Sequence, residues 1–147
     1  ASLGWNADVF AEIPKAVAAA QKADVIVAVV GMYDDENGDR ATLNLDEAQE
    51  KLILELAKLE KPMVVVVQSG CVITMRKWLD KVPAVMMAWY PGEEGGTAVA
   101  QTLFGDNNPS AKLPITIPKE TGQVPLTYNR FPGKDTRPVD RGLDRYW

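Results

Sequence analysis

Two uninterrupted apolar runs constrain the fold of this chain more than any other feature. They are VIVAVVG, which follows Asp24, and MVVVV, which begins directly after Pro62. Neither run alternates with polar residues, a pattern typical of strands buried on both faces of a parallel sheet. Both runs are far shorter than the roughly 20 apolar residues that span a bilayer. We therefore expect buried strands and no membrane-spanning segment.

The rest of the first 118 residues alternates between helical and extended patterns. Apolar residues recur at helical spacing around the two strands, and proline or glycine separates the segments. Strands that alternate with helices predict an α/β fold with a doubly wound, mostly parallel sheet and flanking helices. The expected elements are helices over 8–22, 46–60 and 96–104, a short helical stretch near 75–80, a third strand over 83–89 and a brief sheet edge over 113–117.

Beyond Lys119 the sequence becomes polar and rich in proline. Such a segment buries too little apolar surface to fold alone. We therefore divide the chain into an α/β domain over 1–118 and an extended arm over 119–147. The arm is expected to lie across another domain or chain, anchored by its aromatic residues Tyr128, Phe131, Tyr146 and Trp147.

Composition excludes several kinds of chemistry. The chain contains 147 residues with 16 basic and 20 acidic side chains, so it lacks the basic excess typical of nucleic-acid binders. It has no histidine and a single cysteine, Cys71, which excludes catalytic pairs of serine or cysteine with histidine and also an internal disulfide. Neither the dinucleotide nor the P-loop fingerprint is present, and we expect no cofactor. Any catalysis must therefore depend on carboxylates.

An acidic loop follows the first predicted strand at Gly31, where open α/β sheets place their ligands. Like charges at close range disfavour simultaneous ionisation, so at least one carboxyl should have a raised pKa, as a general acid requires. In the alternative interpretation, this is a solvated loop in which Asp39 and Arg40 merely pair. The loop does not match a calcium-binding EF-hand, so we expect no metal site. Its charged residues are Asp34, Asp35, Glu36, Asp39 and Arg40.

Two aromatic residues end the third predicted strand on the same side of the sheet as the acidic loop. Trp89 and Tyr90 belong either to the core or to a surface that stacks on the apolar face of a ligand such as a sugar. The PGEEGG turn that follows is better explained by helix capping than by anion binding, because Glu93 and Glu94 would repel an anion.

Four motifs together resemble the C-terminal α/β sandwich domain of glycoside hydrolase family 3, the β-glucosidases and their relatives. The motifs are KADVIVAVVG, ENGDRATLNLDEAQ, KPMVVVVQSG and AVMMAWYPGEEGGTAVAQTLFGDNNPSAKLPITIPKETGQVPLTYN. The resemblance covers about residues 23–128. The stretch from WYPGEEGG to LFGDNNPSAKLP carries it most specifically.

The resemblance implies retaining hydrolysis of β-linked sugars by two carboxylates. An aspartate on a separate (β/α)₈ barrel domain forms the glycosyl-enzyme intermediate, and a glutamate of the sandwich domain is the general acid/base. That glutamate lies four residues before the arginine of an Asp-Arg pair, which corresponds here to Glu36. Asp35, Asp39 and Arg40 would then shape the loop or contact substrate, together with Trp89 and Tyr90, and the charges of Asp34 and Asp35 would raise the pKa of Glu36.

The resemblance also implies that this chain is an incomplete sandwich domain of a larger enzyme. The barrel nucleophile is absent, so we expect the 147 residues alone to be inactive. The first strands of the family domain are also absent, which leaves an open sheet edge for association with a second copy of the chain. The resemblance alone suggests a periplasmic or secreted location. The alternatives are a non-catalytic glycan-binding domain and a structural accessory domain.

Overall fold

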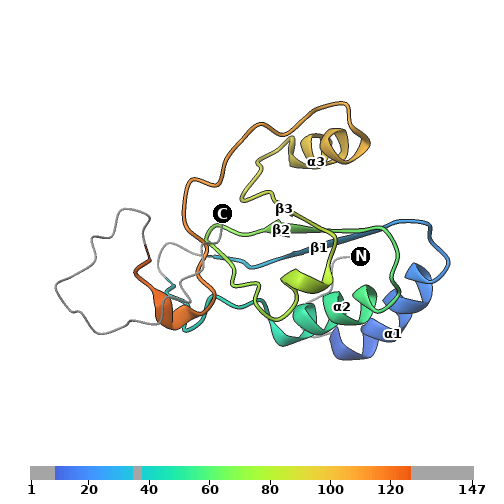
Figure 1. Cartoon of the computed structure of the whole chain (residues 1–147), viewed down its shortest axis with the longest axis horizontal. Coiled ribbons are helices and arrows are strands. Elements are labelled where there is room, and N and C mark those ends of the chain that lie inside the picture. The colour runs from blue at the N-terminus through green and yellow to red at the C-terminus, as the bar shows by residue number, and fades with distance from the viewer. Residues whose placement is uncertain (1–8, 35–37, 127–147) are drawn as a thin grey trace.

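A parallel three-stranded sheet forms the centre of the computed structural model, which describes residues 9–34 and 38–126 (Figure 1). The strands are β1 (Ile26–Gly31), β2 (Met63–Gln68) and β3 (Ala84–Met87), in the spatial order β1-β2-β3. Ile26 lies opposite Met63 and Gly31 opposite Gln68, so β1 and β2 begin and end together. The predicted parallel α/β fold is confirmed.

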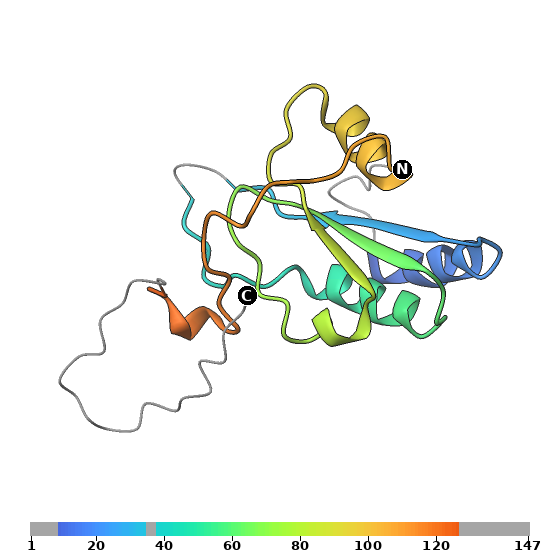
Figure 2. The same cartoon turned by 45° about the horizontal axis from the view of Figure 1, so that its top comes forward.

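Helices lie on both sides of this sheet. Helices α1 (Val9–Ala20) and α2 (Glu47–Ala57) lie side by side on one side, and α3 (Gly95–Phe104) lies on the other (Figure 2). Lys61, just before β2, donates hydrogen bonds to three carbonyl oxygens at the end of α1 and beyond it, those of Ala20, Gln21 and Ala23, at 3.1, 2.6 and 2.5 Å. A cation is favourable at a helix C-terminus because the carbonyl groups there are partly negative. None of the described helices is long and apolar enough to cross a membrane.

The core is centred on the middle strand. Val65, Val66 and Val67 of β2 are completely buried, which shows that β2 is covered on both faces as predicted. Ile53 of α2 and Trp78 are also completely buried and belong to the same core. Burial of such side chains contributes roughly 1.5–3 kcal/mol each to the driving force for folding.

The prediction that β1 is buried on both faces is wrong. Ile26, Ala28 and Val30 are buried, but Val27 and Val29 are 47% and 57% exposed. The reason is that α1 and α2 cover only one face of the sheet, and α3, on the other side, leaves Val27 and Val29 exposed (Figure 2). An uninterrupted apolar run cannot reveal this, because successive side chains alternate between faces whatever their chemistry.

Other elements differ from prediction in extent. The predicted helical stretch near 75–80 is a single 3₁₀ turn, η1 (Leu79–Lys81), and the third strand is shorter than 83–89. Residues 113–117 form no strand in the structure, where Pro114 lacks the donor that a ladder requires. A second 3₁₀ turn, η2 (Thr121–Gln123), lies in the predicted arm, whose aromatic anchors fall outside the described residues.

We predict that Val65→Ala destabilises the chain by about 2 kcal/mol, because it removes buried methyl groups and leaves a cavity. The matched variant Val29→Ala removes the same atoms from an exposed position and should cost about 0.5 kcal/mol or less. Urea unfolding of the 147-residue chain, followed by tryptophan fluorescence, measures both. Equal losses would contradict the one-sided burial of β1.

Candidate active site at the ends of the strands

The carboxyl ends of the three parallel strands meet at one edge of the sheet. Gly31 ends β1 so close to β2 that a Cβ atom there would lie 1.8 Å from the carbonyl oxygen of Gln68, so only glycine fits. The side-chain amide of Gln49, on α2, accepts a hydrogen bond from the Gly31 nitrogen at 2.8 Å and donates one to the Gly31 oxygen at 2.9 Å. The point at which the acidic loop leaves the sheet is therefore fixed by both β2 and α2.

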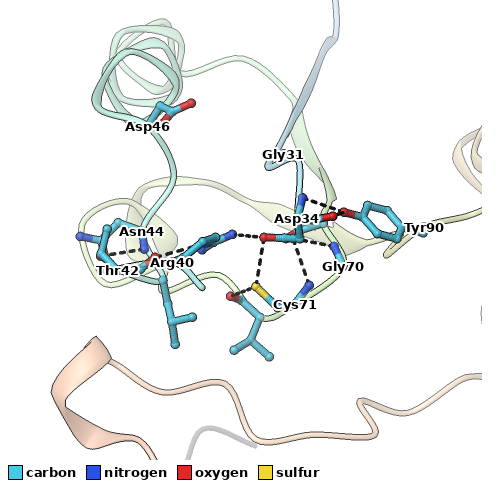
Figure 3. Close-up of polar contacts among 12 residues, drawn as sticks. Gly31, Asp34, Arg40, Thr42, Asn44, Asp46, Gly70, Cys71 and Tyr90 are labelled. Carbon is cyan, nitrogen blue, oxygen red and sulfur yellow. Dashed lines mark hydrogen bonds and ion pairs between the residues drawn. The ribbon is translucent and has the colours of Figure 1, made fainter. Parts of the chain in front are cut away.

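The carboxylate of Asp34 is the centre of the polar contacts at this edge (Figure 3). Its Oδ1 accepts a hydrogen bond from Arg40 Nη1 at 2.8 Å. Its Oδ2 accepts hydrogen bonds from Ser69 Oγ and the Gly70 nitrogen, both at 2.8 Å, and from the Cys71 nitrogen at 3.3 Å. One side chain therefore joins the loop after β1 to the loop after β2.

Tyr90 joins the loop after β3 to the same residue. Its hydroxyl accepts a hydrogen bond from the Asp34 nitrogen at 2.8 Å and donates one to the Asp34 carbonyl oxygen at 3.0 Å. Its ring lies against Gly70, where a Cβ atom would come within 2.6 Å of it (Figure 3). Loops after all three strands thus converge on Asp34.

The contacts of Asp34 keep it ionised. Burial by itself would raise the pKa of this carboxyl, but the hydrogen bond from Ser69, the hydrogen bond and charge of Arg40 and the Gly70 N–H outweigh it. The net result is a pKa below the ordinary value of 3.8. Cys71 shows the opposite effect, since burial and the nearby Asp34 charge raise the pKa of its thiol against the pull of Arg40. The thiol is therefore a poor nucleophile.

Arg40 pairs with Asp34 and not with the adjacent Asp39. Its Nε also donates to the carbonyl oxygen of Thr42 at 3.2 Å, while Asp39 is exposed to solvent. The suggested pairing of Asp39 with Arg40 is thus wrong for the described residues. Arg40 Nη2 is buried and has no hydrogen-bond partner among residues 9–34 and 38–126.

The remaining predicted site residues are distributed as follows. Asp35 and Glu36 lie in 35–37, outside the described residues, so the expected elevated pKa of Glu36 stays a prediction. Trp89 is partly buried with a left-handed φ of 53°, a conformation unusual for a bulky residue. The Tyr90 hydroxyl is engaged on Asp34, although the residue is 57% exposed.

Sequence reasoning missed the central place of Asp34, Ser69 and Gln49. The Ser-Gly pair that ends the second apolar run was a usable signal, since a hydroxyl and a free N–H at a strand end are ready donors for a carboxylate on the neighbouring loop. Within residues 9–34 and 38–126 no group of three or more acidic, cysteine or histidine side chains could hold a metal ion.

One hollow lies beside this edge of the sheet, and another lies along β3. The first, of about 440 Å³, is lined by Arg40, Thr42, Asn44, Glu47 and Lys77 among others, and Lys77 forms an ion pair with the buried Glu50 at 2.5 Å. That hydrogen bond raises the pKa of Lys77, so the ammonium stays charged. The other, of about 900 Å³, is an apolar groove between β3 and residues 113–119 and contains none of the residues that contact Asp34.

An α/β domain with a carboxylate-centred site at its strand ends belongs to a broad class of ligand-binding and catalytic domains. Comparison with known families narrows the class: the model of the glycosyl hydrolase family 3 C-terminal domain matches residues 7–146. The chain belongs to this family, and the resemblance noted in the sequence is confirmed.

Relatives of this chain include beta-glucosidases and a beta-xylosidase. The chain is 41% identical over 124 residues to a periplasmic beta-glucosidase of Salmonella typhimurium, covering 82% of this chain and 16% of that protein. It is 37% identical to a beta-xylosidase of Formosa agariphila, covering 88% of this chain and 18% of that protein. Among solved structures, the beta-glucosidase of Listeria innocua in complex with glucose matches with a TM-score of 0.80 and 34% identity, over 92% of this chain and 19% of that one. The chain thus spans less than a fifth of each of these proteins.

We predict that Asp34→Asn lowers the free energy of unfolding at neutral pH, because an amide cannot accept all of these bonds or pair with Arg40. Since the pKa of Asp34 is lower in the folded chain than in the unfolded one, its stabilisation is present above about pH 4 and is lost as the pH falls through the folded pKa. The difference between wild type and variant should therefore shrink under acid conditions. Urea titrations at a series of pH values measure it, and a difference independent of pH would contradict the assignment.

Proposed function

We propose that this chain is the domain that supplies the general acid/base of a retaining β-glycosidase, β-glucosidase-like in its substrate. The nucleophilic aspartate would lie on a (β/α)₈ barrel domain that the chain does not contain. The proposal is supported by family membership, by the activities named for its relatives and by the site at the strand ends.

One observation carries the proposal: the loop that includes Glu36 is held at its base on both sides. Asp34 precedes 35–37 and contacts the loops after β2 and β3, while Arg40 follows and is bonded to Asp34. A general acid must be held within hydrogen-bond reach of the oxygen it protonates, and a loop fixed in this way meets that need.

The charges of the loop favour Glu36 over its neighbours as the proton donor. Asp34 is held ionised and has its acceptor capacity occupied, and Asp39 is exposed to water. The family offset from Arg40 selects Glu36 rather than Asp35. Glu36 would protonate the glycosidic oxygen as the barrel aspartate attacks the anomeric carbon, and would then take a proton from the water that hydrolyses the glycosyl-enzyme.

The other predicted residues would complete the pocket edge. Trp89 is held in a strained backbone conformation next to the site, as residues at functional sites often are, and would stack on a sugar or aglycone. Asp35 and Asp39 would contact substrate or shape the loop, and Nη2 of Arg40 would donate to a loop carbonyl or a substrate hydroxyl. Two carboxylates suffice for this reaction, so no cofactor is required.

The wider setting is part of the same proposal. The substrate would be a terminal β-linked glycoside or oligosaccharide, and the enzyme would be periplasmic or secreted, as the name of the Salmonella relative suggests. The outer edge of β1 is unpaired within residues 9–34 and 38–126 and offers a surface for association with a second copy.

We predict that the isolated 147-residue chain does not hydrolyse an activated aryl β-glucoside, because retention needs two carboxylates about 5–5.5 Å apart on opposite sides of the bond. Release of the phenolate, followed by absorbance, measures this. Turnover by the isolated chain that is abolished by Glu36→Gln would show that the chain contains its own nucleophile.

In the full-length protein that contains this chain, Glu36→Ala should lower turnover of an aryl glucoside with a poor leaving group by about 10²–10⁴-fold. Azide should restore part of the rate with a good leaving group, since it replaces the water that needs the base. Glu93→Ala removes an exposed glutamate from the loop after β3 and is the matched control. Weaker binding with unchanged turnover would instead indicate an accessory glycan-binding domain.

A further inference from the structure

We propose that Asp34 is the positioning residue for the acid/base Glu36: its carboxylate fixes the base of the loop against the two neighbouring strand ends. The inference rests on the proposed role of Glu36. Asp34 transfers no proton itself and acts only through the loop that it holds.

The first contact closes the loop upon itself. Asp34 and Arg40 lie six positions apart, and their ion pair of 2.8 Å bridges the base of the loop. The two side chains are only 16% and 15% exposed. A pair so shielded is weakened by salt far less than an exposed pair, and it retains a fixed geometry that exposed pairs lack.

The second set of contacts orients the closed loop relative to β2. Two of the three Oδ2 donors, the nitrogens of Gly70 and Cys71, belong to the backbone and cannot rotate away. Ser69, which is completely buried, donates the third hydrogen bond. These hydrogen bonds thus hold the base of the loop against the end of β2, the most deeply buried strand of the sheet.

The third contact fixes the backbone of Asp34. Tyr90 bonds both its nitrogen and its carbonyl oxygen, so the peptide groups on both sides of the residue are held. The direction in which the chain leaves Asp34 toward Glu36 is therefore set by β3 as well as β2. Displacement of a proton donor by about 1 Å can lower the reaction rate roughly 100-fold, so contacts that fix the base of its loop would affect the rate directly.

The test uses the full-length protein that contains this chain, with Asp34→Asn and the matched control Asp24→Asn. Asp24 is exposed and precedes β1 at the opposite end of the same strand. With a poor phenolate leaving group, Asp34→Asn should lower kcat/KM by about 10–100-fold, mostly through kcat, whereas Asp24→Asn should match the parent. With a dinitrophenolate leaving group, which needs no proton, the loss in kcat/KM should nearly vanish, while kcat should still fall because hydrolysis of the glycosyl-enzyme needs Glu36 as the base.

A double variant separates this role from the proposed function. If Asp34 acts only through Glu36, then Asp34→Asn/Glu36→Gln should be no slower than Glu36→Gln alone. Losses that multiply would overturn the inference. Parent activity in Glu36→Gln would instead refute the proposed function, and a normal Asp34→Asn beside a slow Glu36→Gln would refute the positioning role alone.

Tyr90→Phe keeps the test decisive if Asp34→Asn does not fold. It removes one hydroxyl and preserves the ring against Gly70. We expect the same dependence on leaving group at a smaller magnitude. A lowered Tm with kcat unchanged for both leaving groups would show a merely structural contact and overturn the inference.

Discussion

The parallel register of β1, β2 and β3 is the constraint on which the rest of the structure depends. Val65 and Val67 of β2 point toward the core formed with α2, while Val66, completely buried as well, points to the other face. Gly31 approaches the Gln68 carbonyl so closely that only glycine fits, and a slip of one residue would place a side chain there. With that register set, Gly31 lies opposite Gln68 and the loops that follow β1 and β2 leave the sheet side by side. Asp34 can reach the backbone donors of the neighbouring loop only because the two strands end together.

Asp34 and the proposed general acid need opposite protonation states. A carboxyl that anchors a loop must stay ionised, because each of its bonds comes from a donor and the pair with Arg40 depends on its charge. A carboxyl that protonates a leaving oxygen must hold its proton near neutral pH. Under the proposed function, the loop would therefore separate two tasks that one acid could not perform. Asp34 is surrounded by donors, which lower its pKa despite burial.

The sequence was sufficient to predict the parallel strands, the helices between them and the edge of the sheet that carries the polar site, because these follow from apolar runs, helical periodicity and chain reversal. It was insufficient wherever tertiary contacts decide. The exposed face of β1 depends on where the helices pack, which Val27 and Val29 do not encode. The partner of Arg40 was expected at the neighbouring position, but the guanidinium lies 2.8 Å from the carboxylate of Asp34, six positions earlier, a contact that only the folded chain brings about. The donors of Ser69 and Tyr90 come from other strands, so only the assembled sheet brings them to Asp34.

The number of hydrogen bonds that hold Asp34 can be explained by the way a two-domain glycosidase would work. Retaining hydrolysis places its two carboxyls about 5–5.5 Å apart, yet here the acid and the nucleophile are proposed to come from different domains. Any movement between the domains adds to the movement of the loop itself, and both displace the acid from the bond that is cleaved. This domain cannot reduce the movement between the domains. Hydrogen bonds between Asp34 and residues of three loops, however, reduce the movement of the acid/base loop at its base. The rigid base of the loop is therefore the contribution that a partial site can make to the geometry of the complete one.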